Sequence, residues 1–206
     1  DHVGRAPKLI REGFKGQVYM TAPTRDLTEA ILRDSAHILA QNARDHGLPT
    51  LYDDRDIAAL LSRIELLPYR TEHTVAPGLS VYLRDTGLIL GSASVRVKDE
   101  DGTTFAVTGD IGNSPAILLP DAEPIDDADV VLIESVYGDR QNPEKAHRVA
   151  KLEEVLKRAL ARGGTVLIPA FSIERTQLML YELSNLFESG ALPKVPVYLD
   201  SPLAIT

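Results

Sequence analysis

The chain has 206 residues, of which 44% are hydrophobic and 25% charged, and a formal net charge of -8. These proportions are typical of a folded globular protein with one sizeable core, or with one domain and the start of another. The negative charge argues against a protein that coats nucleic acid through bulk electrostatics, although an acidic enzyme can hold a locally basic groove. Cysteine is absent, which excludes disulfides and thiolate metal sites, so His, Asp and Glu would hold any transition metal.

No apolar run approaches the ~18 residues that a membrane-spanning helix needs. The first residues also lack the basic and then apolar pattern of a secretory signal. We therefore expect a cytoplasmic protein with no membrane partner.

The first 110 residues predict a mixture of helices and strands. Asp26 and Glu29 are spaced like a capping box at the start of a helix, and Gly47 and Pro49 follow its end. A charged stretch followed by Gly102 predicts a hairpin turn. The expected elements are a strand at 17–21, helices at 26–45 and 56–66, and strands at 79–83, 88–97 and 104–108.

A different pattern follows in the second half. Residues 130–133 form a continuous apolar run of the kind that is buried in a sheet. Helices and strands then alternate, with Gly163, Gly164 and Gly190 where helices would end. The expected elements are helices at 144–162 and 174–188, a buried strand at 165–168 and a further strand at 197–199. This change near residue 140 is the best candidate for a domain boundary.

Three acidic residues follow expected strands directly: Asp110, Glu134 and Asp200. Strand ends in α/β proteins face the crevice where ligands bind, so these carboxylates are candidates for metal binding or acid–base chemistry. For any one of them alone, capping a helix or ordering a turn is the more common role. Gly109 and Gly112 flank Asp110 and would let the backbone approach a ligand closely.

The histidines give a weaker signal. His37 and His147 fall in expected helices, and we assign structural or solvated roles to His46 and His73. His2 differs because it stands beside Asp1, and an acid next to an imidazole is a weak indication of a metal site. No glycine-rich stretch has the spacing of a dinucleotide or nucleoside triphosphate loop.

Taken together, several segments resemble the β-CASP branch of the metallo-β-lactamase superfamily, which includes RNase J and the nuclease of the cleavage and polyadenylation machinery. The order and spacing of the motifs are specific, and the resemblance covers almost the whole chain. The matching segments are Asp1-His2-Val3-Gly4-Arg5, Leu88-Ile89-Leu90-Gly91-Ser92-Ala93, Thr108-Gly109-Asp110-Ile111-Gly112, Glu134-Ser135-Val136-Tyr137-Gly138-Asp139-Arg140, Pro169-Ala170-Phe171 with Arg175-Thr176-Gln177, and Tyr198-Leu199-Asp200-Ser201-Pro202-Leu203-Ala204.

The resemblance implies a partial metallo-β-lactamase αββα sandwich at residues 1–140 and the first part of a β-CASP α/β domain at 141–206. It also implies a two-metal ribonuclease acting on single-stranded RNA, with a homodimer as one arrangement. Two Zn²⁺ ions, or Mn²⁺ in their place, would lie ~3.5–4 Å apart and hold the attacking hydroxide. By the same resemblance Asp1 and His2 would bind one metal, and Asp110 would bridge both. Asp1, Asp110 and Glu134 would be the catalytic residues, with Glu134 orienting a ligand or helping proton transfer.

One internal position departs from the family pattern: Leu88 stands where the third motif has a histidine, and leucine cannot bind a metal. The family's earlier paired histidines would precede Asp1, and its later histidine motifs would follow Thr206. We therefore expect these 206 residues alone to be inactive. An active parent ribonuclease is the first hypothesis, and a catalytically silent scaffold that binds RNA or a protein is the second. A third hypothesis is an α/β binding module unrelated to metal-dependent enzymes, but the order of the motifs would then be a coincidence.

Overall fold

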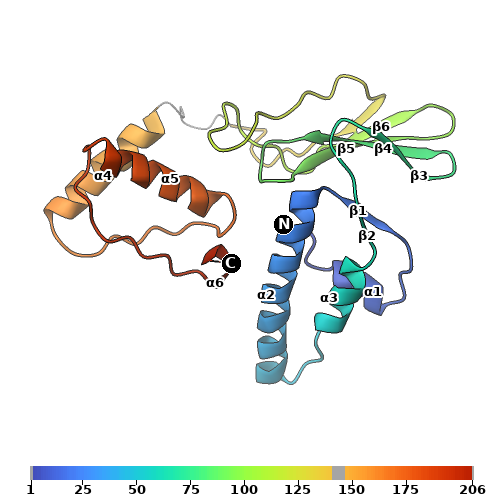
Figure 1. The fold of residues 1–206 in the computed structure, drawn as a ribbon, viewed down its shortest axis with the longest axis horizontal. Helices are drawn as coiled ribbons and strands as arrows, with labels where there is room; N and C mark the ends of the chain where they lie inside the picture. The colour runs from blue at the N-terminus through green and yellow to red at the C-terminus, as the bar shows by residue number, and fades with distance from the viewer. Residues whose placement is uncertain (1, 141–146, 206) are drawn as a thin grey trace. The chain divides into compact units, whose positions relative to one another are not determined.

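The computed structural model describes residues 2–140 and 147–205 (Figure 1). The chain divides into two compact units, residues 1–134 and 135–206. The first unit is a mixed α/β structure with a two-stranded sheet and a five-stranded sheet. Among the described helices, none is long and apolar enough to cross a bilayer. The elements of the first unit are α1 (Ala6–Arg11), β1 (Val18–Met20), α2 (Ala22–His46), α3 (Asp54–Leu61), β2 (Ile64–Leu66), β3 (Glu72–Ala76), β4 (Leu79–Asp85), β5 (Ala93–Lys98), β6 (Thr104–Val107) and β7 (Val130–Leu132).

The helices of this unit surround a small core. Leu32 and Ala36 of α2 pack with Tyr52, Ile57 and Leu60 from the α3 region, and all five are buried. The long helix was expected at 26–45 but begins at Ala22, because the Thr21 side chain accepts a hydrogen bond from the Thr24 N–H at 3.3 Å. The capping box expected at Asp26 is therefore wrong. Gly47, with φ +65°, ends the helix as expected.

The second helix was expected at 56–66, but the observed helix α3 starts two residues earlier and ends at Leu61. Asp53 caps α3, and the Asp56 carboxylate accepts a hydrogen bond from the Asp53 N–H, so a capping box sets the start. The helix stops at Leu61, and Ile64–Leu66 becomes β2, which pairs in parallel with β1. An apolar residue at helical spacing, Ile64, thus belongs to a strand because a neighbouring strand satisfies its backbone.

The five-stranded sheet has the order β3-β4-β5-β6-β7, antiparallel except for the parallel pair β6–β7. The hairpin expected at Gly102 is present between β5 and β6. The expectation of a strand from Leu88 is wrong, because residues 88–92 form a loop and β5 begins at Ala93. Strand β7 is confirmed but its expected burial is not, since Val130, Val131 and Leu132 are each more than 40% exposed. Strand β7 stands at the end of the strand order, so it has a neighbouring strand on one side only.

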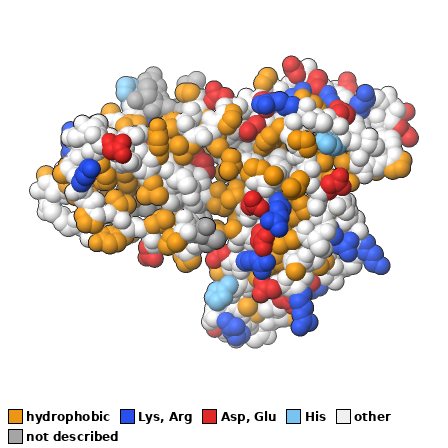
Figure 2. Space-filling model, in the orientation of Figure 1, with side chains coloured by type: hydrophobic (Ala, Val, Ile, Leu, Met, Phe, Trp, Pro, Cys, Tyr) orange, Lys and Arg blue, Asp and Glu red, His pale blue; other side chains and the backbone are white. Residues whose placement is uncertain are grey.

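The described helices of the second unit are α4 (Arg148–Ala161), α5 (Arg175–Glu188) and α6 (Pro202–Ile205). Leu156 of α4 packs against Leu183 and Leu186 of α5 and against Leu192. Residues 144–146 of the first expected helix lie outside the described residues. Hydrophobic side chains also reach the surface of this unit on the face shown in Figure 2.

The strands expected at 165–168 and 197–199 are absent from the described structure of this unit. Leu167 and Tyr198 are 90% and 86% exposed. A strand needs a hydrogen-bonded neighbour, and no described segment forms a ladder with either run. Apolar, β-branched sequence alone was therefore not enough to form these strands.

Candidate metal centre

Thr108 joins the carboxyl ends of two parallel strands. Its N–H donates to the carbonyl oxygen of Leu132 at 3.0 Å, and its hydroxyl accepts from the N–H of Glu134 at 3.1 Å. Because β6 and β7 run in parallel, Asp110 and Glu134 both follow the same edge of the sheet. The expectation that these two acids follow strand ends is confirmed. Asp200 follows no strand in the described structure.

His2 and Asp110 lie together although 108 positions separate them in the chain. The distance from His2 Nε2 to Asp110 Oδ2 is 3.5 Å, and the two side chains are 75% and 40% exposed. Both line a pocket of about 270 Å³, which Leu88 also lines. The site thus brings together two of the expected ligands and the third-motif position. Asp1, the remaining expected ligand, lies outside the described residues.

Polar contacts fix the backbone of the loop that carries Leu88. The Ser92 hydroxyl accepts from the N–H groups of Leu88 and Ile89 at 3.2 and 3.3 Å. From the start of α2, the hydroxyls of Thr21 and Thr24 both donate to the Gly91 carbonyl at 2.8 Å. None of these contacts uses the Leu88 side chain, so the frame of this loop does not depend on which residue stands at position 88.

Tyr69 supplies a further anchor for the same loop. Its hydroxyl donates to the carbonyl oxygen of Ser92 at 2.8 Å. Burial, helped by the nearby Asp85 carboxylate, raises the pKa of Tyr69 to about 12. The phenol is therefore neutral at physiological pH and available as a donor.

The loop of Leu88 is also fastened to the loop of Asp110. The N–H of Gly112 donates to the Thr86 carbonyl at 2.8 Å. Gly112 packs directly on Gly87, and a Cβ at residue 112 would stand 1.9 Å from the Gly87 carbonyl oxygen. Glycine at position 112 is thus required by a close backbone approach, and that approach fixes the two loops to each other.

The donor set near Asp110 is incomplete within the described residues. An imidazole nitrogen and a carboxylate oxygen suit zinc or manganese. No group of three or more His, Cys, Asp or Glu side chains that could hold an ion occurs in residues 2–140 and 147–205. The Thr86 hydroxyl, in the same loop as Leu88, is buried and has no hydrogen-bond partner in the described structure. His2 and Asp110 fit two positions of a metal shell, and Leu88, which lines the same pocket, offers no donor atom.

Sequence reasoning missed the residues that hold this site in place. Tyr69 and Thr86 carried no recognised signal, and Thr108 was read only as a motif position. A hydroxyl residue directly after a strand, between that strand and an acid, is the signal that would have pointed to Thr108.

An exposed histidine beside an acid, at the carboxyl end of a sheet strand, is an arrangement typical of metal-dependent hydrolases. No protein-family model matches the chain. Curated relatives do: ribonuclease TTHA0252 of Thermus thermophilus is 38% identical over 204 residues, covering 99% of this chain and 44% of its own length. An RNase J-like protein of Methanocaldococcus jannaschii is 34% identical over 206 residues, covering 98% and 45%. The transcription termination factor FttA of Pyrococcus abyssi is 36% identical over 207 residues, covering 97% and 31%.

The chain is homologous over nearly its whole length to the β-CASP ribonucleases, as its motifs predicted. It spans less than half the length of these relatives.

Proposed function

We propose that this chain is part of a metal-dependent ribonuclease that hydrolyses single-stranded RNA in the cytoplasm. Residues 1–140 would form part of a metallo-β-lactamase αββα sandwich, and residues 141–206 the start of the β-CASP domain. The observation that carries the proposal is the 3.5 Å approach of His2 to Asp110 at the end of β6. Relatives named as ribonucleases support the choice of RNA.

In this proposal the chain's own residues supply donors and orientation. Asp110 offers carboxylate oxygens, and His2 offers an imidazole nitrogen, with Asp1 joining them by family resemblance. A bound zinc or manganese pair would supply Lewis acidity and lower the pKa of a water molecule. Glu134, at the same sheet edge, would orient a ligand or accept a proton. Thr108 holds the backbone of Glu134 through the 3.1 Å hydrogen bond.

A silent scaffold is the second candidate, and Leu88 favours it. A side chain without a donor lines the same pocket as His2 and Asp110. The intact frame of the Leu88 loop favours the enzyme, because that frame would present an imidazole at position 88 to the pocket. The two candidates therefore make different predictions for a histidine introduced at position 88. The enzyme predicts that it binds a metal ion, and the scaffold predicts that it does not.

The test is Leu88→His in this chain, with Zn²⁺ and Mn²⁺ affinity measured by calorimetry. We expect weak binding by the unaltered chain and affinity higher by about 10–100-fold in the variant, since a further donor joins His2 and Asp110. Leu90→His is the matched control, because Leu90 lies in the same loop, is 60% exposed and does not line the pocket.

Equal gains in Leu88→His and Leu90→His, or no gain in either, would favour the scaffold. Cleavage of a single-stranded RNA is measured in the same samples. Efficient metal-dependent cleavage by the unaltered chain would show that the site uses other ligands, and would overturn the assignment of Leu88 as the missing donor.

A further inference from the structure

One face of the five-stranded sheet carries a row of polar side chains. Glu72 of β3, Tyr82 of β4 and Arg96 of β5 stand directly opposite one another, so they share a face. Arg84, two positions from Tyr82, lies on that face as well. The guanidinium groups of Arg84 and Arg96 lie 4.8 and 4.9 Å from the centroid of the Tyr82 ring. Glu72 pairs with Arg96, whereas Arg84 has no acidic partner among these strand residues.

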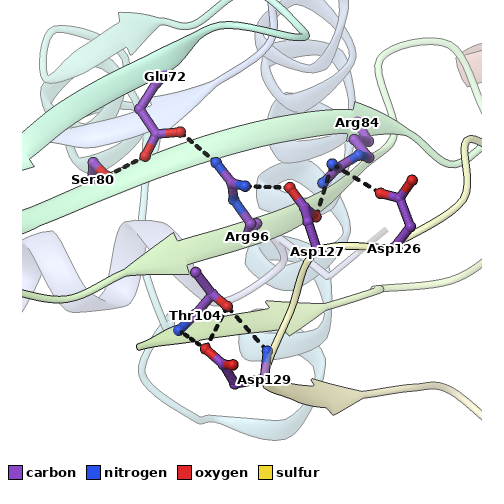
Figure 3. Close-up of polar contacts among 8 residues, drawn as sticks. All are labelled: Glu72, Ser80, Arg84, Arg96, Thr104, Asp126, Asp127 and Asp129. Carbon is purple, nitrogen blue, oxygen red and sulfur yellow. Dashed lines mark hydrogen bonds and ion pairs between the residues drawn. The ribbon is translucent and has the colours of Figure 1, made fainter. Parts of the chain in front are cut away.

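Residues 121–129, which we call the acidic strap, supply partners for both Arg84 and Arg96. Asp127 pairs with Arg84 at 2.8 Å and also with Arg96, while Asp126 lies 3.6 Å from Arg84 (Figure 3). The side chains of Arg84 and Arg96 are only 12% and 15% exposed. Removing one partner of such shielded cations destabilises the fold, because it leaves a poorly hydrated charge.

The strap is also tied at the strand that leads into the Leu88 loop. Glu123 receives two hydrogen bonds from the Arg70 guanidinium, at 2.7 and 3.1 Å. Its backbone N–H donates to the Asp85 carbonyl at 2.9 Å, and its carboxylate accepts from the Asp85 N–H at 3.3 Å. The strap is thus fixed at the end of β4 before it reaches Arg84 and Arg96.

Hydrogen bonds between Asp129 and Thr104, which we call the clasp, hold the end of the strap where β6 and β7 begin. The Asp129 carboxylate accepts from both the N–H and the hydroxyl of Thr104 at 2.8 Å (Figure 3). In return the Asp129 N–H donates to the Thr104 carbonyl at 3.0 Å. The first ladder pair, Phe105 with Val130, follows directly. A shift of one residue at this point would move every later residue of β7 to the opposite face.

We propose that Asp129, held by the acidic strap, is a positioning residue: its clasp on Thr104 sets the register of β7 and so places Glu134 at the same sheet edge as Asp110. The role assigned to Glu134 rests on the proposed function, but the register does not. Thr104 and Thr108 fix the parallel pair at its two ends, with Asp129 at the first and Glu134 at the second.

The experiment follows β7 by NMR in this chain without metal, so the result does not depend on metal binding. In Asp129→Ala we expect amide exchange at Thr108 and Glu134 to be faster by at least about tenfold. The cross-strand NOEs between Phe105 and Val130 should weaken. Amides in the β4–β5 ladder should keep their exchange rates, which separates a change of position from a general loss of stability.

Asp126→Ala is the matched control, because Asp126 belongs to the strap but, among the described residues, forms only the 3.6 Å ion pair with Arg84. It should leave β7 unchanged. Asp129→Asn, which keeps an acceptor oxygen for Thr104, should restore most of the protection. Thr104→Val removes the hydroxyl alone and gives a milder test if Asp129→Ala does not fold.

Unchanged exchange at Thr108 and Glu134 in both Asp129→Ala and Thr104→Val would overturn the proposal. Faster exchange that spreads equally to the β4–β5 amides would overturn it as well, because the clasp would then be a general stabilising contact. A failure of Leu88→His to gain metal affinity would leave this result intact.

Discussion

Gly112 lies so close to Gly87 that a Cβ at residue 112 would stand 1.9 Å from the Gly87 carbonyl oxygen. The nearest atoms are backbone, which cannot rotate away as a side chain could. We therefore expect Gly112→Ala to force the loops of Leu88 and Asp110 apart. The cost is about 1–3 kcal/mol or more in the free energy of unfolding, the range for overpacking a close contact. Urea denaturation monitored by circular dichroism measures it.

Gly4→Ala is the control for this prediction. A Cβ at residue 4 meets nothing within 4 Å, and the backbone there does not adopt positive φ. Its free energy of unfolding should change by no more than about 0.5 kcal/mol, as for most surface substitutions. Equal effects of the two variants would show that the approach of Gly112 to Gly87 is not tight in solution.

Tyr69 gives a prediction at alkaline pH. Burial raises its pKa from 10.0 to about 12 in the folded state. The unfolded chain therefore releases the phenolic proton first, so the contribution of Tyr69 to stability is present below pH 10 and is lost as pH rises from about 10 to 12. In Tyr69→Phe this part of the alkaline decline should disappear.

The same variant should also lose stability at neutral pH. Ser92 would lose the 2.8 Å hydrogen bond from Tyr69, which costs about 0.5–1.5 kcal/mol. Chemical denaturation of both proteins from pH 7 to 11 provides the comparison. Parallel alkaline declines in the two proteins would contradict the assignment to Tyr69.

Local patterns predicted those parts of the fold in which the chain satisfies its own backbone. The helix of residues 174–188 was expected almost as observed at Arg175–Glu188, and Gly102 marked the β5–β6 hairpin. The predictions failed where a segment becomes a strand only if another strand pairs with it. Ile64 had helical spacing but joins β2, and Val197–Leu199 had strand composition but no described neighbour.

The candidate site shows the same division. Motif order identified Asp110, His2 and Leu88 as members of one site, and the structure places all three on one pocket. The supporting contacts could not be read from the sequence, because they join segments far apart. Thr104 and Asp129 are 25 residues apart, and neither has a local pattern that indicates the other.

The acidic strap predicts a loss of stability in acid. Arg70 lowers the pKa of Glu123, Arg84 lowers that of Asp127, and hydrogen bonds from Thr104 lower that of Asp129. A carboxyl whose folded pKa is depressed contributes stability above its unfolded pKa of about 4, and that contribution is lost as pH falls through the folded pKa. We expect the free energy of unfolding to decline below about pH 4.5.

Asp127→Asn isolates one member of this group. The amide cannot titrate, so the variant should be less stable at pH 7 and should lose less as pH falls. The two stability curves should therefore converge in acid. Curves that stay parallel from pH 7 to pH 3 would show that Asp127 does not contribute to the acid dependence. Asp121→Asn serves as a control, because Asp121 forms no ion pair with another described residue and accepts a hydrogen bond from the Ala116 N–H.

Glu174 offers a substitution that should stabilise the second unit. Its backbone has φ +64° and ψ -56°, and the N–H of Arg175 donates to the Ile173 carbonyl at 2.8 Å, so the three residues form a γ-turn before α5. A side chain in this conformation is strained by about 1–3 kcal/mol. Glycine relieves the strain but has more freedom when unfolded, which costs about 0.5–1 kcal/mol. We expect Glu174→Gly to raise the free energy of unfolding by about 1 kcal/mol.

Glu174→Ala distinguishes backbone strain from loss of the carboxylate. Alanine keeps the Cβ and therefore the strain, so this variant should show no gain, whereas Glu174→Gly should. The hydrogen bond from the Leu178 N–H to the carbonyl of residue 174 is retained in both. Thermal melts of the three proteins, followed by helical circular dichroism, give the comparison. The carboxylate at the start of α5 is lost in both variants, so the difference between them isolates the backbone. Equal stabilities of the alanine and glycine variants would show that the γ-turn is not a source of strain.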